Sequence, residues 1–333
     1  MKLPYRDLST GVETLTAACE IFDRLMDDIM QRIMANPLIM LDPTYFGKQI
    51  FAIDRHFFFN CAEIRKFIRS VIEEKKAKKE KDGQDVISLI LSDPNYQVAE
   101  DIVDDVIVMF FAGSKTVQTT TSNLITSLLF EPEIFAKMRG EEVDPLMERV
   151  KDDILGKMTL KEVDDCELIK MCYMEAMRRN SPAAISSTAC MSKDCNITGL
   201  DLPANQGFLI FINAIQNDPS QWREPELFKP ERFDPASEWY KRPDGGKRNS
   251  HAFSPFLGGS RVCLGKTFAE VTLRFTIPLY YHFFDFELVE PAHKKERPVV
   301  WLGATKAINI PIKFITRNKV PANLTAPDTA ETQ

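Results

Sequence analysis

The residues best suited to chemistry in this sequence surround Cys263. The stretch from Phe256 to Gly265 reads FLGGSRVCLG and leads into an apolar helical pattern over 264–283. A thiolate at the start of a helix is stabilised by unpaired backbone N–H groups and by the helix dipole, and it is a good metal ligand. Gly259 would let the backbone approach a flat ligand because it has no Cβ atom. The alternative is an inert, buried cysteine in a glycine-rich turn.

Other side chains of the same loop have a use beside a bound ligand. Phe256 would shield the sulfur from water, and Arg261 is placed to pair with a carboxylate group of that ligand. Phe256, Gly259, Arg261, Cys263 and Gly265 together fit the pattern FxxGxRxCxG at every fixed position. Five matched positions favour a metal-binding thiolate over an inert cysteine.

This loop resembles the haem-binding signature of the cytochrome P-450 superfamily. Three more motifs follow the family's order and spacing: AGSKT at 112–116, EAMR at 175–178 and PERF at 230–233. They resemble the family's oxygen-binding AGxxT, its ExxR and its PERF motif. The resemblance covers 15–317 and implies that Cys263 is the axial ligand of the iron of a haem b group.

The resemblance also implies a structural triad. Glu175 and Arg178 are three residues apart and share a helix face. Taken alone, such a pair is most often a weak surface ion pair. In the family the matching residues join the PERF arginine, here Arg232, in a buried cluster behind the haem, where each guanidinium can grip the carboxylate with two hydrogen bonds.

On the oxygen side, the resemblance assigns roles to three residues of the long helix. Ala112 and Gly113 match the pair that opens a groove for O₂, and Thr116 matches the hydroxyl that assists protonation. The same letters alone could be a packing notch of small residues. Lys115 stands where the family usually has Asp or Glu, and a lysine relays protons only if burial removes its charge. Slow or uncoupled oxygen activation and peroxide-transforming isomerase chemistry are both open.

The elements that must position these residues are mostly helices. Apolar spacing predicts helices over 12–35, 48–76 and 99–129, and shorter ones over 133–155 and 160–180. The pattern then changes to short strands, which are expected over 185–191, 207–213, 284–289 and 307–315. Residues 215–262 are dense in Pro and Gly and predict a long ordered loop, which is usually functional.

The predicted fold is mostly α with a smaller β part (α+β), a cytochrome P-450 fold lacking its N-terminal helices and part of its main sheet. One partial domain is expected over 1–317, with a disordered tail over 319–333. Its parts are substrate-roofing helices (12–75), an oxygen-side helix (99–129), the ExxR helix (160–180), the PERF and cysteine loop (215–265) and a haem-proximal helix (264–283). Roughly a third of the family's usual length is absent, and Thr188 replaces a frequent propionate-binding Arg. A truncated product, an incomplete gene model and a dead relative are all open.

Composition narrows the class further. A net charge of −6 gives no electrostatic attraction to nucleic acid. Seven scattered cysteines without a CxxC pair indicate reduced thiols, and four histidines not spaced for zinc argue against a zinc site. The sequence has no signal peptide and no run that could span a bilayer. The family implies the cytosolic face of the endoplasmic reticulum; without an anchor, peripheral membrane contact or a cytoplasmic location is expected.

The resulting hypothesis is a haem-dependent monooxygenase acting on a lipophilic small molecule. Electrons would come from NADPH through a separate reductase, because no flavin or nicotinamide fingerprint is present. The reductase would dock near Arg242, Lys247, Arg248 and Lys266. Expected substrate contacts are 30–60, Phe110, Phe111, 183–187 and 301–305. The alternatives are a non-catalytic or degenerate haem-binding fragment and a helical scaffold with a structural cysteine.

Overall fold

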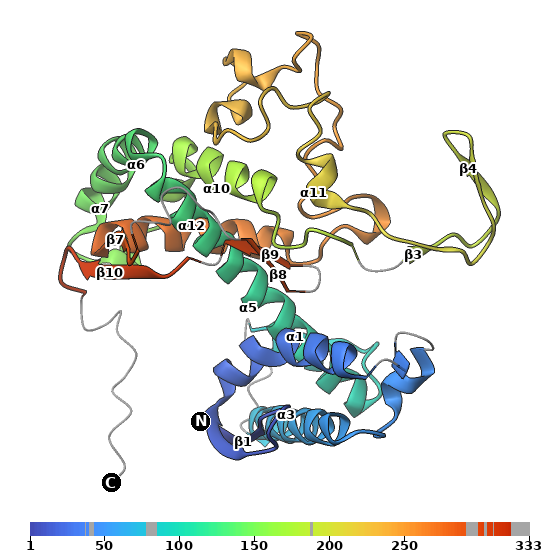
Figure 1. Ribbon diagram of the computed structural model, residues 1–333. Coiled ribbons are helices and arrows are strands. Elements are labelled where there is room, and N and C mark those ends of the chain that lie inside the picture. The colour runs from blue at the N-terminus through green and yellow to red at the C-terminus, as the bar shows by residue number, and fades with distance from the viewer. Residues whose placement is uncertain are drawn as a thin grey trace. The chain divides into compact units, whose positions relative to one another are not determined.

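Helices make up most of the structure, and the strands form small two-stranded sheets, which confirms the predicted mostly α fold with a smaller β part (Figure 1). The computed structural model describes residues 1–36, 38–39, 43–77, 85–186, 189–290, 299–302, 305–308 and 310–320. The chain divides into two units, Met1–Lys115 and Thr116–Gln333, which are described separately.

The first unit begins with a β-hairpin. Strand β1 (Lys2–Arg6) pairs antiparallel with β2 (Glu13–Ala17), and helix α1 follows directly (Ala18–Ala35). The helix predicted over 12–35 is therefore wrong for its first residues. Thr14 and Thr16 are β-branched residues that favour extended backbone, and β1 supplies the hydrogen bonds that a helix would otherwise supply.

Helix α3 (Ala52–Ala77) forms the central support of the first unit. Its buried positions recur every three or four residues, as expected for one helix face: Phe57, Asn60, Ile64, Ile68 and Ile72. Asn60 fixes the hairpin to this helix, because its side chain accepts from Arg6 N at 2.7 Å and donates to Arg6 O at 2.8 Å. The described part of this unit also contains the 3-10 turn η1 (Pro43–Gly47), α4 (Val86–Ser92) and the start of α5 (Ala99–Leu129).

Helix α5 (Ala99–Leu129) has the bounds predicted for the long apolar helix, and the boundary between the two units falls within it. It ends at Leu129, and Pro132 occupies the first turn of α6 (Pro132–Met138), where a proline is tolerated. Among the described residues, no helix has both the length and the apolar character that a bilayer crossing requires.

The second unit is built on a helical core. Helices α10 (Glu167–Arg179) and α12 (Lys266–Phe283) lie side by side (Figure 1). The helix predicted over 160–180 is interrupted at Asp165 and Cys166, and α12 begins two residues later than predicted. Further helices in the described part of this unit are α6 (Pro132–Met138), the π-helix η2 (Arg139–Val143), α7 (Asp144–Val150), α8 (Ile154–Lys157), α9 (Leu160–Asp164) and α11 (Ile212–Ile215).

Strands of the second unit pair as four small antiparallel sheets within the described residues. The pairs are β3 (Ala189–Cys190) with β6 (Gly207–Phe208), β4 (Cys195–Ile197) with β5 (Leu200–Leu202), β7 (Phe284–Leu288) with β10 (Ile312–Thr316), and β8 (Val299–Leu302) with β9 (Thr305–Ile308). The strand predicted over 207–213 is cut short because α11 begins at Ile212. The turn between β4 and β5 contains Thr198 and Gly199, with φ of 52° and 91°.

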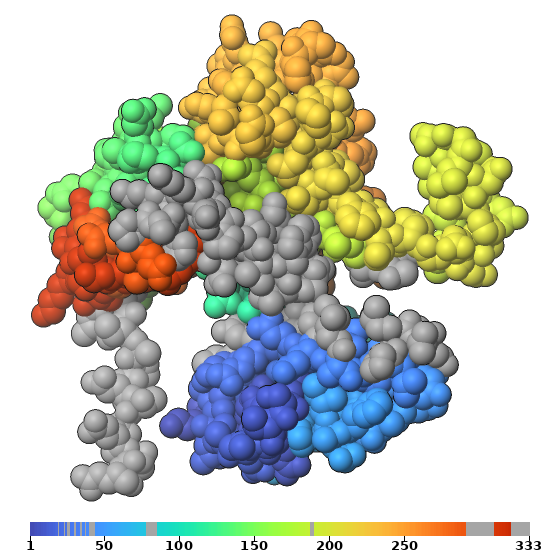
Figure 2. Space-filling view, viewed as in Figure 1, coloured from blue at the N-terminus to red at the C-terminus, as the bar shows by residue number. Residues whose placement is uncertain are grey.

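The long loop between α11 and α12 is ordered by its own side chains. Trp222 and Phe228 are 1% and 2% exposed. Figure 2 shows much of this loop, in yellow and orange, as a closely packed mass of atoms. Three 3-10 turns interrupt it: η3 (Pro230–Phe233), η4 (Glu238–Tyr240) and η5 (Gly259–Arg261). Residues 321–333 lie outside the described residues, so disorder of the tail stays a prediction.

Candidate functional site

The cysteine loop is closed by a backbone hydrogen bond. Cys263 N donates to Phe256 O at 3.0 Å, and Lys266 N donates to Cys263 O at 3.3 Å as α12 begins. Leu257 and Gly259 have φ of 59° and 69°, a region that favours glycine and costs a leucine conformational energy. The loop therefore presents residue 263 just before the first turn of α12, where the helix has unpaired N–H groups.

The sulfur of this loop is open to a ligand. Cys263 is exposed, and so are the apolar side chains Val262 (47%), Leu264 (86%) and Phe268 (63%). Exposed apolar groups around a thiol suit a flat, mostly apolar ligand that covers them. Among the described residues, no group of three His, Cys, Asp or Glu side chains is arranged to hold a metal ion. The single exposed thiol of Cys263, set among exposed apolar side chains, fits haem, whose iron is held by a largely apolar macrocycle.

Other residues predicted for this loop take different positions. Arg261 is exposed at the end of η5, where it is free of the protein core. Phe256 is partly buried and packs against the core of the second unit. Its shielding of the sulfur stays a prediction. At Gly265, an added Cβ would lie 3.9 Å from the sulfur of Cys263, which is ordinary van der Waals contact.

The structure brings Glu175, Arg178 and Arg232 together with all three side chains fully buried. Arg178 grips the carboxylate with two hydrogen bonds, from Nε to Oε2 at 2.7 Å and from Nη2 to Oε1 at 2.8 Å. Lys229 N donates to the same carboxylate at 3.0 Å. The carboxylate balances one of the two guanidinium charges, and the remaining N–H groups of both arginines donate to backbone carbonyls.

Arg232 does not make the expected two-bond grip. Its Nε donates to Glu175 Oε1 at 3.2 Å, while its terminal nitrogens donate to the carbonyls of Arg223 and Glu224. The short turn η3 brings this side chain against the preceding backbone, so Arg232 ties the loop to Glu175. Burial lowers the pKa of Arg232, and the negative charge of Glu175 opposes that shift.

Arg248, a half-buried residue that the sequence reasoning missed, packs against this buried cluster. Its guanidinium carbon lies 4.1 Å from the centre of the Trp222 ring, and its Nη2 donates to Arg232 O. Burial, reinforced by the charge of Arg232, lowers the pKa of Arg248 to about 10. Arg248 is half-buried and stacked on Trp222, and its docking role stays a prediction. The signal was its neighbourhood in a loop rich in Trp and Tyr, on which guanidinium groups stack.

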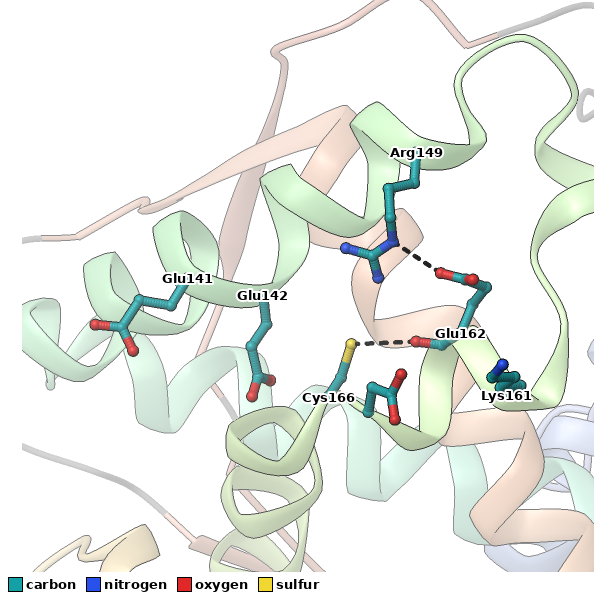
Figure 3. Close-up of a pocket in the computed structure, with 7 residues that line it drawn as sticks. Glu141, Glu142, Arg149, Lys161, Glu162 and Cys166 are labelled. Carbon is teal, nitrogen blue, oxygen red and sulfur yellow. Dashed lines mark hydrogen bonds and ion pairs between the residues drawn. The ribbon is translucent and has the colours of Figure 1, made fainter.

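Glu142, also missed, supports the ExxR helix from the π-helix η2. Its carboxylate accepts from Leu168 N at 2.7 Å and from Ile169 N at 2.8 Å, so it caps the start of α10. This cap is the physical reason that α10 begins anew after α9. Burial raises the pKa of Glu142. Figure 3 shows Glu142 in an acidic pocket lined by Glu141, Glu142, Arg149, Lys161, Glu162, Asp165 and Cys166. None of the predicted site residues lines this pocket.

The predicted oxygen-side residues all lie on α5. Ala112 is exposed and Gly113 is half-buried in the first unit, while Thr116 is half-buried in the second. Ala112 and Thr116 are one helical turn apart and share a face. Lys115 directly precedes Thr116 and is half-buried. Thr188 lies outside the described residues.

Comparison with known proteins places the chain in a family. The model of the family described as Cytochrome P450 matches residues 15–310. The chain is 31% identical to cytochrome P450 71A8 of Mentha piperita over 72% of its length and 47% of that protein. It is 28% identical to 5-epiaristolochene 1,3-dihydroxylase of Nicotiana tabacum (62% and 40%) and 26% identical to cytochrome P450 18a1 of Drosophila melanogaster (69% and 43%). The chain thus spans less than half the length of these relatives. With the cysteine loop and the buried triad in place, this chain belongs to the cytochrome P450 family.

Proposed function

We propose that this chain binds haem b through Cys263 and acts in a monooxygenase that inserts one oxygen atom of O₂ into a lipophilic small molecule. The observation that carries the proposal is the exposed thiol of Cys263, surrounded by exposed apolar side chains at the start of α12. A bound haem supplies an iron centre that activates O₂, and a thiolate ligand donates electron density to it.

Each loop residue has a role in this proposal. Cys263 would bind as the thiolate, stabilised by the N–H groups at the start of α12. Arg261, which is exposed, would pair with a propionate of the haem. Gly259 adopts the left-handed conformation that the turn before Cys263 requires. Glu175, Arg178 and Arg232 would hold the loop and take no part in the chemistry.

On α5, Thr116 would hold and pass a proton toward bound oxygen, and the small residues Ala112 and Gly113 would leave room for it. Lys115 sets this chain apart, because a charged ammonium cannot accept a proton as a carboxylate does. We therefore assign proton delivery to the Thr116 hydroxyl together with water. Lys115 also favours a second candidate, a haem-binding protein without monooxygenase activity.

The electron donor in this proposal is NADPH, acting through a separate reductase. Lys247 and Lys266 are exposed on the loop and helix that flank Cys263, and they would form the docking surface. Arg242 is paired with Asp244 across its own turn. Peripheral contact with the cytosolic face of the endoplasmic reticulum is the location that fits such a partner.

The first test is the absorption spectrum of the reduced, CO-bound protein. We expect a red-shifted Soret band in the wild type and its loss in Cys263→Ala. The control is Cys190→Ala, because Cys190 is another exposed free thiol of the same unit. A red-shifted band that survives in Cys263→Ala would reject the site. Substrate-dependent NADPH consumption with a reductase, together with a hydroxylated product, then separates the monooxygenase from a non-catalytic haem protein.

A further inference from the structure

Gln216 is a fully buried amide between the ExxR helix and the cysteine loop. Its Nε2 donates to Met177 O at 3.0 Å and more weakly to Arg178 O at 3.4 Å. Its Oε1 accepts from Ser254 N at 3.1 Å. The orientation of the amide is unambiguous, because a carbonyl can only accept and a backbone N–H can only donate.

The backbone of Gln216 strengthens this link. Arg178, which grips Glu175 with two hydrogen bonds, also donates from Nη1 to Gln216 O at 3.0 Å. Gln216 thus contacts α10 through both its side chain and its main chain. Gln216 therefore accepts a hydrogen bond from Arg178 of the buried triad and another from the Ser254 backbone.

From Ser254 the hydrogen bonds continue to the cysteine. Leu257 N donates to Ser254 O at 3.0 Å, and Cys263 N donates to Phe256 O at 3.0 Å. The hydrogen bond from Ser254 N to the Gln216 amide therefore connects Gln216 to the turn that carries the Cys263 thiol. Loss of the acceptor would leave a partly buried N–H without a partner, which is costly inside a protein.

We infer that Gln216 is a positioning residue that couples the buried Glu175–Arg178 pair to the cysteine loop and keeps Cys263 where its sulfur can bind haem iron. This inference rests on the proposed function. Gln216 would not touch the haem or the substrate. It acts through the Ser254 backbone.

The chain offers a matched control for this bond. Gln221 makes the same kind of contact on the same loop, because its Oε1 accepts from Asn249 N at 2.9 Å. That bond is at the surface, where water can replace it. Gln216→Met removes both hydrogen-bonding groups at nearly constant volume, and Gln221→Met removes the surface equivalent.

The experiment measures haem content, the Soret band of the reduced CO complex and thermal unfolding of the full chain at pH 8. We expect Gln216→Met to bind haem with the ratio of red-shifted to unshifted complex lowered at least about fivefold, the change expected for one unpaired, partly buried N–H. Gln221→Met should keep the wild-type fraction. Gln216→His should recover most of it, because a neutral imidazole offers one donor and one acceptor.

If Gln216→Met does not fold, Gln216→Asn carries the test, because its shorter amide cannot reach both Met177 O and Ser254 N. A wild-type red-shifted fraction in a folded, haem-loaded Met or Asn variant would overturn the inference while leaving the proposed function intact. Equal losses in the Gln216 and Gln221 variants would also overturn it. If the wild type itself shows no red-shifted band, the proposed function fails and the inference falls with it.

Discussion

Replacing Glu175 by glutamine isolates the contribution of the buried carboxylate to folding. Arg178 donates to this carboxylate from Nε and Nη2, Arg232 from Nε, and Lys229 from its backbone N–H. The side chains of Glu175, Arg178 and Arg232 are 0% exposed. An amide in place of the carboxylate would set an NH₂ group against a guanidinium donor and leave both arginines without a counter-charge in this cluster.

The magnitude follows from burial and can be set against a surface pair with a similar distance between Nε and the carboxylate. Arg178 Nε lies 2.7 Å from Glu175 Oε2, and Arg149 Nε lies 2.8 Å from Glu162 Oε2. The Arg149 and Glu162 side chains are 49% and 32% exposed. We expect Glu175→Gln to lower the free energy of unfolding by about 3–5 kcal/mol. Glu162→Gln should lower it by about 1 kcal/mol or less.

Urea denaturation followed by tryptophan fluorescence measures both values. All three tryptophans belong to the second unit. Trp222 and Trp239 lie 5.2 Å and 4.9 Å from the guanidinium carbons of Arg178 and Arg232, so the signal reports on this cluster. Equal destabilisation by the two variants would refute the view that burial makes this carboxylate indispensable.

Two further predictions concern other buried charges. Asp28 is 5% exposed, accepts from Tyr5 Oη at 2.9 Å, and burial raises its pKa from 3.8 to about 6. Between these two pKa values the folded state holds a proton that the unfolded state releases. Asp28 should therefore lower the free energy of unfolding of the first unit by up to about 3 kcal/mol as pH rises from 4 to 7. Asp28→Asn should remove this loss, measured by hydrogen exchange in α1 and α3; an unchanged pH profile would contradict it. Arg248 Nη1 is buried without a partner among the described residues. In urea denaturation, Arg248→Met should therefore have a free energy of unfolding within about 1 kcal/mol of wild type, whereas Arg232→Met should lower it by about 3–5 kcal/mol. Similar losses in the two variants would contradict the view that only Arg232 pairs with the buried carboxylate.

Features that depend on neighbours in the chain could be predicted from the amino-acid sequence. The bounds of α5 follow from its apolar spacing and from the proline that begins α6. Glu175 and Arg178 face each other because residues three apart on a helix share a face. The turn before Cys263 follows from its glycines. In each of these cases the interactions that determine the structure join residues only a few positions apart in the sequence.

Contacts between distant residues were decided only by the tertiary structure. Gln216 lies 38 residues from both Arg178 and Ser254, so no local pattern shows that its amide bridges them. Arginines are usually exposed cations, yet Arg248 stacks on Trp222 because the loop folds back on itself. The periodicity of apolar residues predicts which face of a helix is buried. Only long-range packing determines which charged and polar groups are removed from water and which groups they hydrogen-bond in the interior.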